Sequence, residues 1–415
     1  MKISLIQPSR NNLKYLKWSY DSIRKNQGDH EVQICVADDA STDGTWEWCM
    51  DMMEHDHNFA AIKNETGKRL GHTILYDTLV NEVAKHDICM IYHADMYLCH
   101  GAIDAIENEL KEKTIVSLTR IEPPLHPPGP EKILEDFGIE PEEFKEDELR
   151  KWLLGFTAGE EIPSTEGIFA PWAFYKKDFQ DINGHDPLYA PQSKEDSDIF
   201  NRFQLNGIKF IQTWKGFVYH MTCRGSRFAD GATRNPNGEV FMKNRETDEW
   251  LNQNQKATRN FIRKWGHFCK HDEYLKPIIP PKYDIGLIVK NCNPLLLKEL
   301  EPWCSTIYTD SNIEQYIAAE QPNTIINLYD RVKPYENEKN NAILVELDTS
   351  RFSKLDYQYI TQLPDIIASD YGLKDLVYEL QTKNNKLLDA FELGNLKISI
   401  NNLNTLEKEL IVCKK

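Results

Sequence analysis

The stretch DICMIYHADM, residues 87–96, decides the fold. Its first half is a short, mostly apolar run, which is typical of a buried β-strand. The run is followed by His93 and Asp95, so the strand ends by presenting a carboxylate. In open α/β sheets, ligands bind outside the carboxyl ends of the strands. Asp95 is therefore expected to face a cleft at the edge of a sheet.

The segments before this strand alternate between strand and helix patterns. Leu16, Tyr20 and Ile23, for example, have the spacing of one helix face. The predicted strands cover residues 2–7, 32–37 and 60–64, and the predicted helices cover residues 13–23, 46–53 and 73–85. Strands that alternate with helices predict an α/β fold, with a mostly parallel sheet and right-handed crossovers.

A second domain is expected after a proline-rich linker. Residues 122–150 contain PPLHPPGP and an acidic stretch, and we expect them to form an insertion or loop in a first domain that ends at residue 276. Residues 277–282 (PIIPPK) are the predicted linker. The strands expected beyond it cover residues 283–289, 305–309, 323–328 and 342–347, and the helices cover residues 295–301 and 313–320. Residues 283–415 are thus expected to form a smaller α/β domain of unknown role.

Composition favours a folded protein of two or three domains. The chain has 415 residues, of which 40% are hydrophobic, so it can bury sizeable cores. No apolar run approaches the roughly 20 residues that span a bilayer, and residues 1–6 lack the features of a signal peptide. The nine cysteines lie singly, without a CxxC pair, which favours reduced thiols over a zinc site. These features predict a cytoplasmic protein.

The charge of the chain is unevenly distributed. A net charge of −16 disfavours broad, non-specific binding of nucleic acid. Residues 224–270 nevertheless hold ten basic and five acidic side chains, whereas residues 131–150 hold three basic and nine acidic ones. The basic stretch fits a phosphate-bearing ligand, and a solvated surface explains most of its side chains equally well.

Four polar segments need a common explanation, and each one alone has an ordinary structural explanation as a cap or turn. They are residues 7–12 (QPSRNN), 38–45 (DDASTDGT), 93–95 (HAD) and 195–202 (EDSDIFNR). In this order, and with RKWG at residues 263–266, the chain resembles a family 2 glycosyltransferase with the GT-A nucleotide-sugar fold, possibly of a viral or phage type. The resemblance covers about residues 1–270, and DDASTDGT is its most specific part.

The resemblance implies a metal-dependent, inverting transfer of sugar from a nucleotide-diphospho donor to an acceptor hydroxyl. Asp95 matches the final aspartate of the DxD motif, which binds Mg²⁺ or Mn²⁺ at the donor pyrophosphate. His220 matches a histidine that often completes the metal shell. Asp196 matches the catalytic base, with Glu195 helping to position the acceptor or the base.

The resemblance also implies contacts with the donor. The residues expected there are Pro8, Arg10, Asp38, Asp39, Gly71, His93, Arg224 and Arg227. Asp39 is expected at the nucleoside, and the two later arginines are expected to neutralise diphosphate. His93 stands where the first aspartate of the motif usually sits. That aspartate tends to face the ribose, to which a histidine can still donate a hydrogen bond.

The acceptor and the class of protein leave alternatives. A glycan or a related molecule is the expected acceptor, and a hydroxymethylated base of phage DNA is the alternative. A different class of protein, a non-catalytic nucleotide-sugar-binding or scaffold protein, is a further alternative. A nucleotidyltransferase usually needs a glycine-rich loop after its first strand, and residues 7–12 contain no glycine. The sugar, the nucleotide and the oligomeric state stay open.

Overall fold

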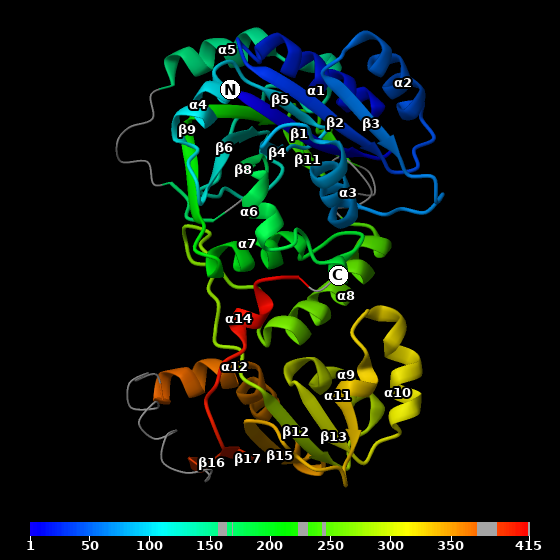
Figure 1. Ribbon diagram of the computed structural model, residues 1–415, viewed down its shortest axis with the longest axis vertical. Helices are drawn as coiled ribbons and strands as arrows, with labels where there is room; N and C mark the ends of the chain where they lie inside the picture. Colours follow the sequence, from blue (N-terminus) through cyan, green and yellow to red (C-terminus); the bar gives the residue numbers. More distant parts are fainter. Residues whose placement is uncertain (157–163, 168, 223–230, 243–245, 372–387, 414–415) are drawn as a thin grey trace. The chain divides into compact units, whose positions relative to one another are not determined.

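The computed structural model describes residues 1–156, 164–167, 169–222, 231–242, 246–371 and 388–413. The chain forms two compact units (Figure 1). The first contains Met1–Asn254, His271–Pro277 and the residues from Val412, and the second contains Gln255–Lys270 and Ile278–Ile411. The boundary after Pro277 lies beside the expected linker, but Gln255–Lys270 group with the second unit and the residues from Val412 with the first. Among the described residues, no helix is both long and apolar enough to cross a membrane.

A nine-stranded mixed sheet organises the first unit. Its order is β3-β2-β1-β4-β8-β6-β9-β5, with β7 paired to β6. The strands are β1 (Lys2–Ser9), β2 (Glu31–Asp38), β3 (Phe59–Lys63), β4 (Ile88–Ile91), β5 (Met96–Leu98), β6 (Thr114–Glu122), β7 (Lys132–Leu134), β8 (Trp172–Tyr175) and β9 (Lys209–His220). Strands β3, β2, β1 and β4 are parallel, as are β7, β6 and β9, whereas β8 and β5 run antiparallel to their neighbours. The expected mostly parallel mixed sheet is confirmed.

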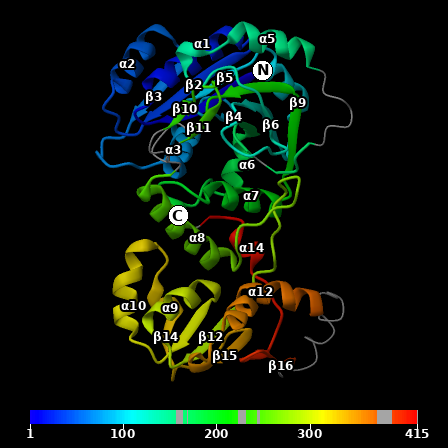
Figure 2. The same ribbon diagram turned by 180° about the vertical axis from the view of Figure 1, so that it is seen from behind.

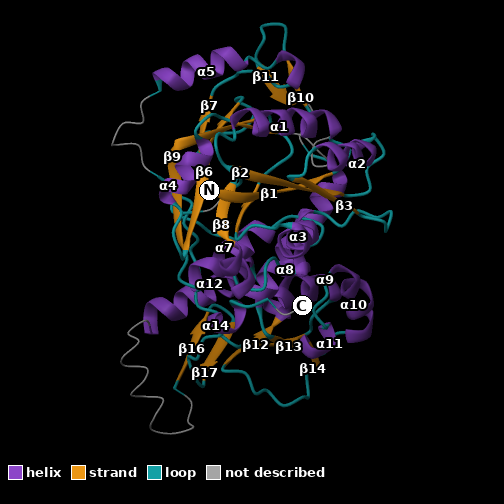
Figure 3. Ribbon diagram, turned by 45° about the horizontal axis from the view of Figure 1, so that its top comes forward, coloured by secondary structure: helices purple, strands orange, loops and turns teal. Residues whose placement is uncertain are grey.

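Helices cover both faces of this sheet (Figure 3). They are α1 (Leu13–Asn26), α2 (Thr45–His55), α3 (His72–Thr78) with a π-helical continuation η1 (Leu79–Val83), α4 (Ala102–Glu109), α5 (Glu146–Gly155), α6 (Lys176–Asp181) and α7 (Glu195–Leu205), with 3₁₀ turns η2 (Pro141–Glu143) and η3 (Pro187–Tyr189). Helices α1, α2 and α4 share one core with Ala173 of β8. Because side chains alternate along a strand, Trp172 and Phe174 face the opposite side, where they contact Phe203 of α7 and Phe179 of α6.

Residues 122–150, expected as an insertion or loop, add structure to the first unit. They supply β7, η2 and part of α5. Phe137 and Leu149 are buried in a small core with Tyr219 of β9. Arg234, in the hairpin of β10 (Ala232–Arg234) and β11 (Val240–Met242) seen in Figure 2, forms a 2.6 Å ion pair with Asp136. A few apolar residues and an ion pair therefore pack this mostly acidic segment against the first unit.

The second unit is a smaller α/β fold around a six-stranded sheet of order β14-β13-β12-β15-β17-β16. Its strands are β12 (Ile285–Lys290), β13 (Thr306–Thr309), β14 (Val332–Pro334), β15 (Ile343–Asp348), β16 (Asp389–Leu393) and β17 (Leu396–Ile400). The first four in this order are parallel, and β17 and β16 are antiparallel. Its helices and turns are α9 (Pro294–Leu300), η4 (Glu301–Trp303), α10 (Ile313–Glu320), η5 (Gln321–Asn323), α11 (Leu328–Arg331), η6 (Thr349–Arg351), α12 (Lys354–Tyr371) and α14 (Glu407–Leu410). Helix α8 (Asp248–Trp265) begins in the first unit and continues in the second.

The strand predicted at residues 323–328 is wrong. The structure has loop there, and the third parallel strand is β14 instead. The side-chain amide of Gln321 donates hydrogen bonds to the carbonyls of Thr324 and Ile326 (3.0 and 2.9 Å), while the side chain of Asn327 caps α11. The side chains of Gln321 and Asn327 thus bond to backbone groups that a strand would have paired with a neighbouring strand.

Candidate active site

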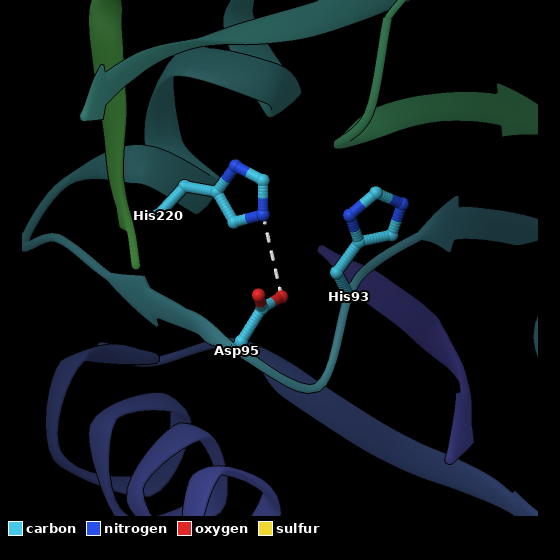
Figure 4. A group of neighbouring side chains, drawn as sticks. All are labelled: His93, Asp95 and His220. Carbon is cyan, nitrogen blue, oxygen red and sulfur yellow. Dashed lines mark ion pairs between the residues drawn. The ribbon is translucent and has the colours of Figure 1, made fainter. Parts of the chain in front are cut away.

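The turn between β4 and β5 brings Asp95 to His220. Strand β4 ends at Ile91, and residues 92–95 turn the chain into β5. The register of β5 against β9 pairs Met96 with His220, the last residue of β9. The side chain of Asp95, one residue before Met96, therefore lies beside His220. Nε2 of His220 is 3.3 Å from Oδ1 of Asp95 (Figure 4).

His93 completes a group of three that could hold a metal ion. One potential ligand atom each from His93, Asp95 and His220 lies within 4.8 Å of the others. The rings of His93 and His220 have centroids 5.5 Å apart. Figure 4 shows all three side chains converging on one point from the β4–β5 turn and the end of β9. Two predicted metal ligands and one predicted donor residue are thus brought together.

Glu122 holds His220 from the other side of its ring. Oε1 of Glu122, at the end of β6, is 2.8 Å from Nδ1 of His220. Burial favours the neutral carboxyl, but Arg120 and His220 outweigh it and hold the pKa of Glu122 well below its usual range. Burial also opposes the charged form of His220, yet Asp95 and Glu122 raise its pKa to about 9. Glu122 leaves Nε2 as the ring atom that faces Asp95, and the charged ring must lose its Nε2 proton before Nε2 can bind a metal.

Burial acts in the opposite direction on His93. It lowers the pKa of His93 to about 3, and the neighbouring charge of His220 adds to this effect. The imidazole of His93 is therefore neutral over the physiological range, which is the state that binds a metal.

The two predicted catalytic carboxylates begin helix α7. Glu195 is buried and Asp196 is exposed toward the cavity. Burial raises the pKa of Glu195, and the charge of Asp196 adds to this effect. Although Asp196 is open to the cavity, the protein around it displaces water and raises its pKa, against the opposing charges of His185 and Arg120. A carboxylate with a raised pKa is the kind of group that serves as a general base near neutral pH.

The backbone before α7 is strained. Ser193 and Lys194 have φ angles of 82° and 69°, in the left-handed region that non-glycine residues rarely adopt. Such residues cost about 1–3 kcal/mol each and cluster at functional sites, where the surrounding structure holds them. The strain sits directly before Glu195 and Asp196, and it sets where these carboxylates point.

A single cavity of about 1150 Å³ in the first unit contains both groups. Asp95, His220 and His93 line it together with Glu195 and Asp196. Two further predicted donor residues, Pro8 and Arg10, line it as well. The remaining positive charge in its wall comes from Arg69, Arg120, Lys132 and Lys194.

Asp38 and Asp39 are not in the wall of this cavity, although both were expected at the donor. Oδ1 of Asp39 accepts hydrogen bonds from the side chain of Asn64 (2.7 Å) and from N of Leu70 (2.9 Å), and Oδ2 accepts from N of Gly71 (2.9 Å). Asp38 accepts from N of Ser41 at 3.1 Å. Asp39 and one oxygen of Asp38 thus hold backbone, whereas Oδ2 of Asp38 is buried without a hydrogen-bond partner among the described residues.

Gly71 is also outside the cavity wall, and packing explains it. Its φ is +77°, and a Cβ there would lie 2.1 Å from the carbonyl oxygen of Pro191. Glycine is needed for the close approach of these two segments. Arg224 and Arg227 lie outside the described residues.

Several residues of the cavity were not anticipated from the sequence. Glu122 follows the same rule as Asp95, a carboxylate at the end of a buried strand, and that signal could have found it. His72 and Trp250 carry no such local signal, because only packing brings them into the wall.

Comparison with known proteins concerns the first unit. Residues 4–159 match the family model described as Glycosyl transferase family 2. This segment of the first unit is similar to that family. The match and the curled, mostly parallel sheet support the GT-A fold for the first unit.

A curated relative of this domain is the abequosyltransferase RfbV of Salmonella typhimurium (strain LT2), which is 29% identical over 119 residues. The match covers 28% of this chain and 35% of that protein, so the chain spans just over a third of the length of this relative.

Solved structures similar to this chain include S. aureus TarS 1–349, at 15% identity over 53% of this chain and 60% of that chain, with a TM-score of 0.38. GalNAc-T7 with UDP, GalNAc and Mn²⁺ is similar at 15% identity over 53% of this chain and 43% of that chain, with a TM-score of 0.40.

Proposed function

We propose that this chain is a metal-dependent, inverting glycosyltransferase. It moves a sugar from a nucleotide-diphospho donor to an acceptor hydroxyl, which belongs to a glycan or a related molecule. The observation that carries the proposal is the shared cavity, which places the Asp95 and His220 pair and the Glu195 and Asp196 pair in one wall. The family 2 match over residues 4–159 supports the same reaction class.

Asp196 is the base in this proposal. Its carboxylate faces the cavity, so it can accept the proton of an acceptor hydroxyl as that oxygen attacks the anomeric carbon. One displacement of this kind inverts the configuration at the anomeric carbon and releases the nucleoside diphosphate. Glu195, buried beside it with a raised pKa, can position the acceptor or the base.

The diphosphate end of the donor is assigned to the part of the wall that contains Asp95 and His220. Asp95 and His220 are the residues that would hold a divalent cation, and their oxygen and nitrogen donors suit Mn²⁺ or Mg²⁺. Such an ion, when bound, supplies positive charge to the departing diphosphate. Arg10 supplies positive charge from the protein. Its Nη1 is buried without a hydrogen-bond partner among the described residues, so this atom can donate to a phosphate oxygen.

The test measures nucleoside diphosphate release from a panel of nucleotide sugars in the presence of Mn²⁺. The full chain should hydrolyse one class of donor, and Asp196→Asn and Asp95→Ala should each reduce turnover by about a hundredfold or more. Asp348→Asn, at a strand end in the second unit, is the control and should retain turnover. Unchanged turnover in both site variants would contradict the assignment of these residues.

Two outcomes separate the alternatives. Binding of a nucleotide sugar without turnover of any donor would favour the non-catalytic binding protein. Transfer to a duplex containing hydroxymethylated bases, but not to glycans, would favour the DNA-modifying enzyme.

A further inference from the structure

The candidate metal group contains two imidazoles and one carboxylate rather than carboxylates alone. Ligands that each lie about 2.1 Å from one ion are at most about 4.2 Å apart. The potential ligand atoms of His93, Asp95 and His220 lie within 4.8 Å of one another, which is close to this limit, so side-chain movement of about half an ångström closes the group. All three side chains line the same cavity.

His93 is held in place from several sides. Its carbonyl oxygen accepts hydrogen bonds from N of Met96 (3.3 Å) and from the side-chain amide of Gln7 (3.4 Å). Its ring stacks on His72, with centroids 6.3 Å apart and planes inclined by 24°. These contacts fix the turn and leave the imidazole directed toward Asp95 and His220 (Figure 4).

The partner set of His220 has the form found behind metal-binding histidines. A ligating histidine usually gives its second ring nitrogen to a carboxylate, which fixes the ring and its tautomer. Glu122 occupies that place at 2.8 Å from Nδ1. Arg120 and Lys132 hold Glu122 in turn, at 3.2 and 3.6 Å.

We propose that His93 is a third protein ligand of the metal, and that the site therefore favours Mn²⁺, Co²⁺ and similar transition ions over Mg²⁺. Mg²⁺ prefers oxygen ligands in near-ideal octahedral geometry, whereas imidazole suits transition ions. The role differs from a hydrogen bond to the ribose of a donor, because it places His93 on the metal. The biological use of the ion rests on the proposed transferase function, but its binding does not require a donor.

The experiment measures metal affinity directly. The full chain is stripped with EDTA and titrated calorimetrically with Mn²⁺ and with Mg²⁺, alone and with UDP present. Wild type should bind Mn²⁺ at least about tenfold more tightly than Mg²⁺, and His93→Asp should reduce this ratio by about tenfold, since even changes to groups that support ligands alter affinity about 10–100-fold. His93→Gln, measured in parallel, should weaken Mn²⁺ and provides a second variant if the first does not fold.

Spectroscopy identifies the ligands, and His55 provides the control. Electron spin echo modulation of bound Mn²⁺ should show ¹⁴N coupling from two imidazoles in wild type and from one in the His93 variants. His55→Gln replaces an exposed imidazole of α2 that is outside both the group of three and the cavity wall, and it should leave both the affinity ratio and the ¹⁴N coupling unchanged.

An unchanged Mn²⁺ to Mg²⁺ ratio and unchanged ¹⁴N coupling in both His93 variants would overturn the inference, as would the absence of Mn²⁺ binding in wild type with or without UDP. Sugar transfer that persists in that case would leave the proposed function standing. Mn²⁺ bound through two imidazoles, together with no turnover of any donor, would instead support the inference and contradict the transferase.

Discussion

Both units place polar side chains at the carboxyl ends of parallel strands, but they use them differently. In the first unit, Nη1 of Arg10, directly after β1, and Oδ2 of Asp38, at the end of β2, are buried without a hydrogen-bond partner among the described residues. In the second, Asp310 accepts from N of Asn291 and Asp348 accepts from the side chain of Asn291, both at 2.8 Å. Polar groups that satisfy one another stabilise a loop, whereas buried polar groups left over can receive a ligand.

The backbone repeats this contrast. Around the cavity, Ser193, Lys194 and Thr222 have positive φ angles that nothing in their own side chains favours. At the strand ends of the second unit, the left-handed residue is Asn291, a type that adopts this conformation readily. Backbone strain that tertiary packing holds in place is typical of functional sites, and here it lies around the cavity of the first unit. The following experiments test whether one edge is built for ligands and the other for stability.

The largest effect is expected from Glu301→Ala in the second unit. Glu301 is fully buried and pairs with Arg263 (2.8 Å) and Arg331 (2.6 Å). Its removal leaves two arginines without this carboxylate and should destabilise the second unit by about 3 kcal/mol. Hydrogen exchange of the amides of β12 and β13 in urea measures the change in that unit.

The control for this variant is Glu314→Ala. Glu314 is exposed on α10 and contacts the hydroxyl of Tyr329, so its loss should cost less than about 0.5 kcal/mol. Neither variant should alter nucleotide affinity. A loss of nucleotide binding in Glu301→Ala at temperatures where the second unit stays folded would show that the two edges are not separate in role.

Arg10→Ala tests the ligand-binding edge. Hydrogen bonds to charged groups contribute about 1.5–3 kcal/mol, so the variant should weaken the tightest-binding nucleoside diphosphate about 10- to 100-fold without lowering stability. Calorimetry with UDP, GDP and CDP measures it. Arg351→Ala, an exposed arginine after β15, is the control and should bind as wild type does. Equal losses of nucleotide affinity in both variants would contradict a ligand-binding role that is special to the strand ends of the first unit.

The smallest effect is a displacement of the pH profile. The base must be deprotonated to act, and burial raises the pKa of Asp196. Below the apparent pKa of the Glu195 and Asp196 pair, kcat/KM should therefore fall about tenfold per pH unit, starting well above the value of about 3.9 for an exposed aspartate.

The comparison carboxylate for the pH profile is Asp348, whose pKa is lowered to about 2 by hydrogen bonds from Asn291 and Ser350. Asp348→Asn should not move the acidic limb. A profile that stays flat down to about pH 4 would contradict a base with a raised pKa.

The strand and helix order could be predicted locally from β1 to β4 and, with one exception, from β12 to β15. The buried runs of β1, β2 and β4 and the apolar spacing of α1 are short-range patterns that need no partner. Residues 323–328 were mispredicted because Gln321, outside the run, takes up its carbonyls. The packing of residues 122–150 depends on Phe137 and Leu149. These two apolar residues stand in a mostly acidic stretch, so the composition of the stretch did not predict a core.

The candidate site was predictable to a smaller extent. Asp95, His220, Glu195, Asp196, Pro8 and Arg10 were anticipated from the family resemblance and all line the cavity. Asp38, Asp39 and Gly71 were anticipated with equal reason but lie outside the cavity wall, so their contact with a donor stays a prediction. A motif gives the type of a side chain, but its hydrogen-bond partners lie on other segments.

By itself, the sequence determined that a buried strand ends before His93 and Asp95 and that a helix opens with Glu195 and Asp196. Local periodicity and composition encode these features. Only the tertiary structure decided that His93 lies with Asp95 and His220, because the antiparallel register of β5 on β9 sets which residue stands opposite Met96. Register depends on how distant strands pack, and a shift of one residue would turn these side chains to the other face of the sheet.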